Sequence, residues 1–372
     1  MAKDDPQILT IARGSEQHPR NGGADLIELA DGSIFMARML AYDSPLDQPA
    51  GDDAPSDLIA QVSRDGGMTW GEQMTFLKPG PDETAAYAPG LLRLSDGDIL
   101  YRYEMYHRFV KDEPRCISGY VCRSRDECRT FDEPVTIFSR SPHLTGSQGD
   151  LRQLASGRIL VPVCHMEGNA LQEDGATLAP TDTSVAGCFT SDDGGRTWDE
   201  CDQYVYLPMR GTMEPKVEQL ADGRLLMVMR TQLGSVFESI SEDEGRTWSN
   251  AQTTGLPAPE SCPGLRRIPQ TGDLLLIWND SPYDPRFDHY GVRSPLSLGI
   301  SKDDGRTWTK MRDLENDPQW EFTNPAVIVT SRDRVVMTYE ASPYDSMEHP
   351  GRLGRTRMDL KLATFDLDWL YG

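Results

Sequence analysis

Carboxylates and histidines recur in this sequence at the ends of short apolar segments. Glu214 and Asp150 each stand just before such a segment, and Glu340 follows another. A pair of carboxyl groups can perform acid–base chemistry, in which one donates a proton and the other attacks a substrate or activates water. Histidines at similar positions, His107 and His165, are suited to general acid–base chemistry. The chemistry that is available depends on which of these segment ends meet in space.

The apolar segments occur in pairs around turn residues, six times along the chain. Typically a D-G, S-G or G-D turn separates two runs rich in Leu, Ile, Val and Met, which predicts a buried β-hairpin. The predicted hairpins lie near residues 24–39, 89–105, 149–166, 215–231, 264–280 and 325–341. If the inner strands converge on one axis, the polar residues at their ends line one mouth of a ring, and burial of so many charges there indicates a polar pocket.

A second repeat, an octapeptide that ends in an aromatic residue, lies between the hairpins. Its five copies read SRDGGMTW, SRDECRTF, SDDGGRTW, SEDEGRTW and SKDDGRTW. Ser and Asp side chains can bind nearby backbone amides, Gly permits positive φ, and the aromatic residue can anchor the turn in apolar packing. We interpret the octapeptide as a turn between two further strands.

Four strands in each of six repeated units account for nearly the whole chain and predict an all-β, six-bladed β-propeller. Residues 1–372 are expected to form a single domain. The sixth unit lacks the octapeptide, while an unassigned apolar run, Ile8 to Ala12, stands near the N-terminus. We therefore predict that a strand from one end of the chain completes the blade begun by the other end, which removes exposed edges.

The composition restricts the partners of the protein. Its 372 residues include 37 basic and 59 acidic side chains, a net charge of −22, which repels nucleic acids and anionic membrane surfaces. Neither a targeting segment nor an apolar stretch of membrane-spanning length is found, and seven cysteines without a CxxC pair favour a cytoplasmic protein with free thiols. We predict no cofactor and no metal, although the acidic stretch from Asp43 to Asp57 leaves calcium open.

The octapeptides match the Asp-box consensus SxDxGxTW. With the six hairpins, they make residues 15–371 resemble the bacterial sialidase-like propellers that carry BNR repeats. The stretches HPRNGGADLIELADG, MEPKVEQLADGRLLMVMRTQLG and RSPLSLGISKDDGRTW resemble a subgroup labelled sialidase-like glycoside hydrolases. The resemblance implies structural Asp boxes on the blade periphery. It also implies three arginines that hold a substrate carboxylate, a tyrosine nucleophile activated by a glutamate, and an aspartate that acts as acid and base.

Several positions match this family pattern. Glu214 matches the glutamate and Arg293 matches the third arginine, while Arg20 lies near the place of the first arginine. Asp52 or Asp53 falls where the resemblance implies the acid–base aspartate.

Two positions depart from the pattern. The sixth unit reads EFTNPAV, which puts Phe322 where the nucleophilic tyrosine should stand, and phenylalanine has no oxygen to attack an anomeric carbon. The stretch GSVFESIS before the fourth box contains no arginine, so Arg230, farther upstream, is the alternative second arginine. An ordinary tyrosine-based sialidase is therefore disfavoured.

We expect a glycoside hydrolase for an acidic or acylated sugar that uses a pair of carboxylates instead of tyrosine. The catalytic candidates are Glu214, Asp53 and Asp52, and the substrate-binding candidates are Arg20, Arg230, Arg293, Asp150, Asn279 and Glu340. The missing tyrosine and arginine leave a non-catalytic carbohydrate-binding propeller as an alternative. A polysaccharide lyase, with His107 or His165 facing a tyrosine such as Tyr87, is the third hypothesis. The sugar, the linkage and the oligomeric state stay open.

Overall fold

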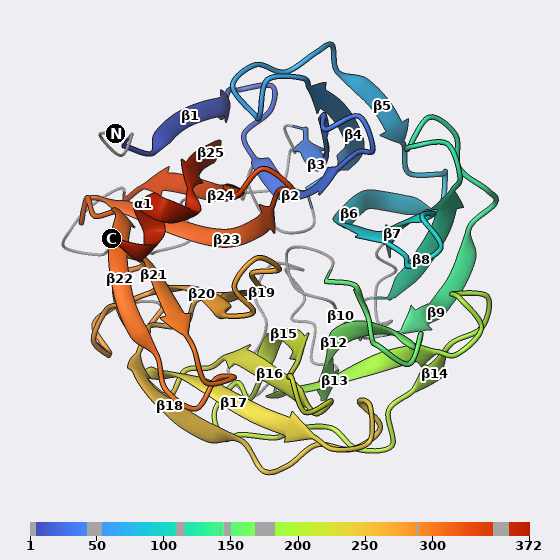
Figure 1. Cartoon of the computed structure of the whole chain (residues 1–372). Coiled ribbons are helices and arrows are strands. Elements are labelled where there is room, and N and C mark those ends of the chain that lie inside the picture. Colours follow the sequence, from blue (N-terminus) through green and yellow to red (C-terminus); the bar gives the residue numbers. More distant parts are fainter. Residues whose placement is uncertain are drawn as a thin grey trace.

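The strands of this protein form a ring of blades around a central axis, as the computed structural model shows (Figure 1). The structure describes residues 5–42, 54–108, 116–141, 143–144, 150–167, 183–287, 289–344 and 357–372. Within these residues the strands form six blades, one for each predicted hairpin, and a single parallel bridge between Ser56 and Ala85 joins the first two blades into one sheet. The predicted all-β propeller is confirmed.

The first three blades occupy the N-terminal half of the chain. Blade 1 contains β2 (Asn21–Glu28), β3 (Ile34–Ala41), β4 (Ser56–Ser63) and β5 (Met74–Leu77). Blade 2 contains β6 (Glu83–Arg93), β7 (Ile99–His107), β8 (Ile117–Ser124) and β9 (Val135–Ser141). Blade 3 contains β10 (His143–Leu144), β11 (Arg152–Gln153), β12 (Ile159–Glu167), β13 (Thr183–Ser191) and β14 (Asp199–Glu200).

The remaining blades follow in chain order around the ring. Blade 4 contains β15 (Met213–Gln219), β16 (Leu225–Arg230), β17 (Ser235–Ser241) and β18 (Gln252–Pro257). Blade 5 contains β19 (Gly264–Arg267), β20 (Leu274–Asn279), β21 (Leu296–Ser301) and β22 (Thr309–Glu315). Blade 6 contains β23 (Trp320–Val329), β24 (Arg334–Pro343) and β25 (Asp359–Asp366), and the short helix α1 (Leu367–Tyr371) follows it.

The two ends of the chain close the ring together. Strand β1 (Gln7–Ala12) pairs antiparallel with β25, with Gln7 opposite Thr364 and Ile8 opposite Ala363. The N-terminal strand thereby becomes the outer strand of blade 6, beside the C-terminal segment (Figure 1). The predicted closure is confirmed, and it covers the edge of β25 that would otherwise be open to pairing with another chain.

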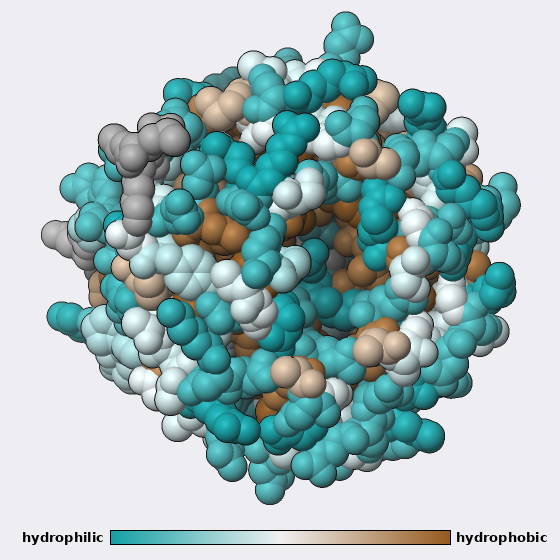
Figure 2. Space-filling view, in the orientation of Figure 1, coloured by the Kyte–Doolittle hydropathy of each residue, from teal (hydrophilic) through white to brown (hydrophobic). Residues whose placement is uncertain are grey.

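The apolar cores lie mainly between neighbouring blades. One cluster joins Leu26 and Met36 of blade 1 to Val336 and Leu362 of blade 6, and the other blade interfaces contain similar clusters. The strands near the axis are buried on both faces, which explains their nearly continuous apolar sequences. Figure 2 shows a mostly hydrophilic rim around a hollow at the centre of the ring.

The Asp boxes are structural turns. In the first box the Ser63 hydroxyl accepts the Gly67 amide, and the Asp65 carboxylate accepts both the amide and the hydroxyl of Thr69, at 2.8 and 2.6 Å. The other four boxes repeat the contact between Asp and Thr. Each of these aspartates is therefore occupied by its own turn, in agreement with the structural role that the resemblance implies.

Candidate active site

An irregularity near the start of four inner strands shapes one mouth of the ring. The pairing register shifts between Gly22 and Asp25, between Tyr87 and Gly90, between Met213 and Lys216, and between Thr323 and Ala326. Each shift contains a residue with positive φ: Gly23, Ala88, Glu214 and Asn324, at 51°, 49°, 47° and 55°. Such bulges bend a strand and change the direction of its side chains.

Glu214 takes this conformation although it is not a glycine. Non-glycine residues in this region are uncommon, and the surrounding structure must hold them there. Its carboxylate oxygen Oε2 accepts a hydrogen bond of 3.0 Å from Arg230 Nη1, and its side chain is 16% exposed. The bulge in β15 and the end of β16 therefore place a carboxylate and a guanidinium together at this mouth.

Arg230 also belongs to a larger cluster centred on Glu260. The Glu260 carboxylate accepts hydrogen bonds from Arg210 Nη1 at 2.5 Å, from Arg230 Nη2 at 2.8 Å and from Gln232 Nε2 at 2.9 Å. Burial opposes the ionisation of Glu260, but the charges of Arg230, Arg210 and His289 outweigh it and hold its pKa well below the ordinary value. Glu260 is 1% exposed, so it is a buried carboxylate that arranges two partly exposed arginines.

Arg293 joins the same cluster from the other side. Its Nε and Nη2 donate to the backbone carbonyl of Glu260, at 3.1 and 2.8 Å, and its Nη1 lies 3.6 Å from Glu321 Oε2. Arg293 and Arg230, two of the three predicted arginines, therefore meet around one residue. The side chain of Arg293 is 3% exposed.

Arg20 forms a second cluster, between blades 6 and 2. Its Nη2 donates to the Tyr87 hydroxyl at 3.3 Å and lies 3.5 Å from Glu340 Oε2. Glu340 also accepts the Gly23 amide and the Asn324 side-chain amide, at 2.8 and 3.0 Å. These polar groups contact one another within a buried network, which ties the first, second and sixth blades together at the mouth.

The remaining predicted residues have different surroundings. Asp52 and Asp53 lie outside the residues that the structure describes. Asp150 lies beside Lys216, 3.0 Å from its Nζ, in the interior of the ring. Asn279 is buried, accepts the Ser261 hydroxyl, and donates to the carbonyls of Pro295 and Phe322, so it links backbone segments.

Phe322 lies in the apolar core. The resemblance puts it in the place of the tyrosine nucleophile, but its ring packs edge-on against Tyr339, in the cluster between blades 5 and 6. It is 2% exposed. Beyond it in β23, the bulge residue Asn324 reaches Glu340 at the mouth.

Glu260 and Arg210 are the residues of this site that sequence reasoning missed. Glu260 stands in PAPESCPG, shortly before the inner strand β19 begins at Gly264. The expectation that polar residues at the ends of inner strands line the mouth covers this position, but nothing in the local sequence distinguishes Glu260 from its neighbours. Arg210 precedes β15 by a similar margin, and no pattern in its neighbourhood marks it.

The histidines of the lyase hypothesis have ordinary structural partners. His107 lies 2.7 Å from the Ser118 hydroxyl, and burial, together with Arg140, lowers its pKa. The ring of His165 packs near Tyr204. Among the described residues, no group of three or more His, Cys, Asp or Glu side chains is arranged to hold a metal ion. No described helix is long and apolar enough to cross a membrane.

Comparisons with known proteins give the family and the fold. A protein of unknown function from Dyadobacter fermentans is 19% identical, with 96% of this chain and 99% of that one covered at a TM-score of 0.71. The Hadza microbial sialidase is 18% identical, with 98% and 69% covered at 0.74, and Trypanosoma rangeli sialidase is 12% identical, with 98% and 60% covered at 0.69. No curated protein matches the sequence.

These solved structures, all less than 25% identical to the chain, establish a sialidase-like fold and leave its chemistry to its own residues. The model of the BNR repeat-like domain matches residues 52–337, which is most of the chain. This protein therefore belongs to the BNR repeat-like domain family.

Proposed function

We propose that this protein hydrolyses a glycosidic bond of a sugar that carries an acidic group, at the mouth where Glu214 meets Arg230. The observation that carries the proposal is the state of the Glu214 carboxylate. One of its oxygens is held by Arg230, whereas Oε1 has no hydrogen-bond partner among the described residues and the side chain is partly exposed. A carboxylate held in this way is available to attack an anomeric carbon or to activate water.

The arginines divide into two groups by exposure. The side chains of Arg210 and Arg230 are 25% and 13% exposed, whereas those of Arg20 and Arg293 are each 3% exposed. In our proposal Arg210 and Arg230 bind the acidic group of the substrate, because a guanidinium fork suits carboxylate geometry. Arg293 and Arg20 are positioning residues, which hold Glu260 and Glu340 in place.

The second carboxyl group of the proposed mechanism comes from the segment before β4. In our proposal, either Asp52 or Asp53 protonates the leaving oxygen, which is the role that the resemblance implies for the acid–base aspartate. Phe322, buried in the core, offers no nucleophilic oxygen, so Glu214 takes the part that tyrosine plays in the family pattern. The fold offers support by analogy: one similar solved structure is a Trypanosoma rangeli sialidase in complex with a sialic acid derivative.

The proposal is tested with a panel of fluorogenic glycosides of sialic and uronic acids, with neutral glycosides for comparison. We expect turnover of an acidic member, and a loss of about 10³-fold or more in kcat for Glu214→Gln. Glu127→Gln is the matched control, because Glu127 also pairs with an arginine, Arg93 at 2.8 Å, but in a peripheral Asp box. Full activity in Glu214→Gln, with intact folding, would remove Glu214 from the chemistry.

A non-catalytic carbohydrate-binding propeller is the second candidate function. Phe322 favours this function, because phenylalanine supplies no hydroxyl where the family pattern has its tyrosine, and its ring is buried in the core. Saturable binding of an acidic sugar without any release of reducing sugar across the panel would establish this function in place of hydrolysis. Under that outcome Arg230→Met should weaken binding, while Glu214→Gln should leave it nearly unchanged or strengthen it.

A further inference from the structure

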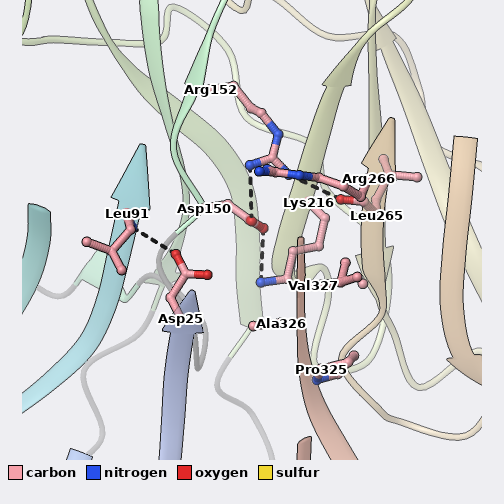
Figure 3. A pocket seen from close by; sticks show the side chains of 11 residues that line it. Asp25, Leu91, Asp150, Arg152, Lys216, Leu265, Arg266, Pro325, Ala326 and Val327 are labelled. Atoms are coloured by element: carbon pink, nitrogen blue, oxygen red, sulfur yellow. Dashed lines mark hydrogen bonds and ion pairs between the residues drawn. The ribbon is translucent and has the colours of Figure 1, made fainter. Parts of the chain in front are cut away.

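A small cavity lies on the axis of the ring, and all six blades contribute to its wall. Its volume is about 20 Å³, which suits one water molecule or one monatomic ion. Figure 3 shows the side chains around it, which come from strands far apart in the sequence. The lining residues include one from each of blades 1 to 6, in order: Asp25, Leu91, Arg152, Lys216, Arg266 and Val327.

Most charges around this cavity are paired. Lys216 Nζ lies 3.0 Å from Asp150 Oδ2, and Arg152 lies 3.5 Å from Asp150 and 2.8 Å from Glu218. These contacts match two cations, Lys216 and Arg152, with two carboxylates. Removing such buried charges from water is costly unless they are paired in this way.

Arg266 is the exception. Within the described part of the chain, its side chain makes no hydrogen bond and no ion pair within 4.0 Å, although it lines the cavity. Figure 3 shows its guanidinium beside that of Arg152, and burial and the Arg152 charge both lower the pKa of Arg266. A guanidinium keeps its charge in proteins, so two like charges face the same small space with one of them unmatched.

Asp25 is a further carboxylate that acts on Arg266, but its hydrogen bonds come from two backbone amides. Its Oδ2 accepts the Leu91 amide and its Oδ1 accepts the Leu26 amide, at 2.8 and 2.9 Å. Burial outweighs these two hydrogen bonds and raises the pKa of Asp25 to about 7. When Asp25 is protonated and neutral, three cations remain around the cavity against two carboxylates, which leaves one excess positive charge. The cations are Lys216, Arg152 and Arg266, and the carboxylates are Asp150 and Glu218.

We propose that this cavity binds one halide anion, chloride or bromide, between the guanidinium groups of Arg266 and Arg152. The anion supplies the negative charge that Arg266 lacks and reduces the repulsion between the two arginines. Because Arg152 belongs to blade 3 and Arg266 to blade 5, the bound anion links two blades that are not neighbours in the ring. The small volume of the cavity favours a monatomic anion over a bulkier one such as sulfate.

The site is distinct from the mouth. Lys216 follows Glu214 by two residues along β15, beyond the bulge, and Arg266 lies within β19 rather than before it. Halide binding therefore does not depend on the proposed hydrolysis.

Halide affinity should also depend on pH through Asp25. The charged groups that act on Asp25 include Asp150, Arg266, Arg102 and Arg152. As the pH rises through about 7, Asp25 loses its proton and its negative charge competes with the anion. Binding should be tighter below that pH and weaker above it, and Asp25→Asn should bind halide tightly at both.

A crystal of the protein soaked in sodium bromide provides the direct test. Diffraction at the bromine absorption edge should show an anomalous peak in the cavity, in contact with both Arg152 and Arg266. A cavity that holds only water, with bromide confined to the protein surface, would overturn the proposal.

Thermal unfolding tests the site in solution. At pH 6, bromide should raise the unfolding midpoint more than gluconate does at the same ionic strength, because only the small anion fits the cavity. Arg266→Met should lose the difference between the two salts. Arg267→Met, which removes a neighbouring arginine bound to Asp304 and to the Gln219 carbonyl, should keep it. An equal response to both salts in the native protein refutes the proposal even if Arg266→Met does not fold.

Discussion

Replacement of Glu260 by glutamine should separate the electrostatic part of the cluster from its shape. Glutamine keeps the size of the side chain and one carbonyl oxygen, but it removes the charge that faces Arg210 and Arg230 at 2.5 and 2.8 Å. Loss of one partner from a buried ion pair costs about 3–5 kcal/mol. Both arginines retain some contact with solvent, which favours the lower end, so we expect a loss of about 3 kcal/mol in the free energy of unfolding at pH 7.

This loss should depend on pH. The pKa of Glu260 in the folded protein lies well below its ordinary value of 4.5, so its charge stabilises the fold above that pH, and this contribution disappears as the pH falls below it. Glu260→Gln lacks the titrating group. The difference in stability between the native protein and the variant should therefore be largest at neutral pH and should shrink progressively in acid.

Urea denaturation followed by tryptophan fluorescence, at several pH values between neutral and acid, measures the difference. Glu127→Gln is the control, because its pair with Arg93 is about one third exposed and is expected to contribute only about 0.2–1 kcal/mol. A Glu260→Gln variant as stable as the native protein at pH 7, or a difference that does not change with pH, would refute the reasoning.

Three further predictions concern the scaffold. Asp243→Ala removes the acceptor of the Thr247 amide and hydroxyl in the fourth Asp box and should lower the free energy of unfolding by about 1–2 kcal/mol, as measured in urea. Gly245→Ala should lower the thermal unfolding midpoint more than Gly97→Ala does. The two glycines have similar φ values, 90° and 96°, but a Cβ at Gly245 would lie 2.5 Å from the Leu160 side chain, whereas Gly97 has open space. Equal losses would contradict the packing argument. Deletion of residues 1–12 removes β1 and exposes the edge of β25, so light scattering should detect more association than in the full chain.

The sequence was sufficient to predict the blades because each hairpin and each Asp box is specified locally. In the fourth unit, for example, a D-G turn joins two apolar runs, and the observed strands β15 and β16 lie on either side of it. The closing role of β1 was predictable for a different reason. An apolar run without a partner in its own unit must pair elsewhere, and the sixth unit was one strand short.

The site was predictable only in part, because its contacts cross between blades and its strands are bulged. Glu260 has no local pattern, and its importance depends on arginines that stand 50 and 30 residues earlier in the chain. The direction of Phe322 and Asn324 depends on the bulge in β23, which interrupts the alternation of side chains that a regular strand would give. Pairing of Arg230 with both Glu214 and Glu260 likewise required the juxtaposition of blades 4 and 5.

In our proposal, Glu214 and the partly exposed Arg210 and Arg230 form a site for an acidic glycoside. A crystal structure of Glu214→Gln soaked with an acidic glycoside that the native protein cleaves tests it most directly. We expect the acidic group to lie on Arg210 and Arg230, with the anomeric carbon facing residue 214. A glycoside bound away from this mouth, or one whose anomeric carbon faces another carboxylate, would contradict it.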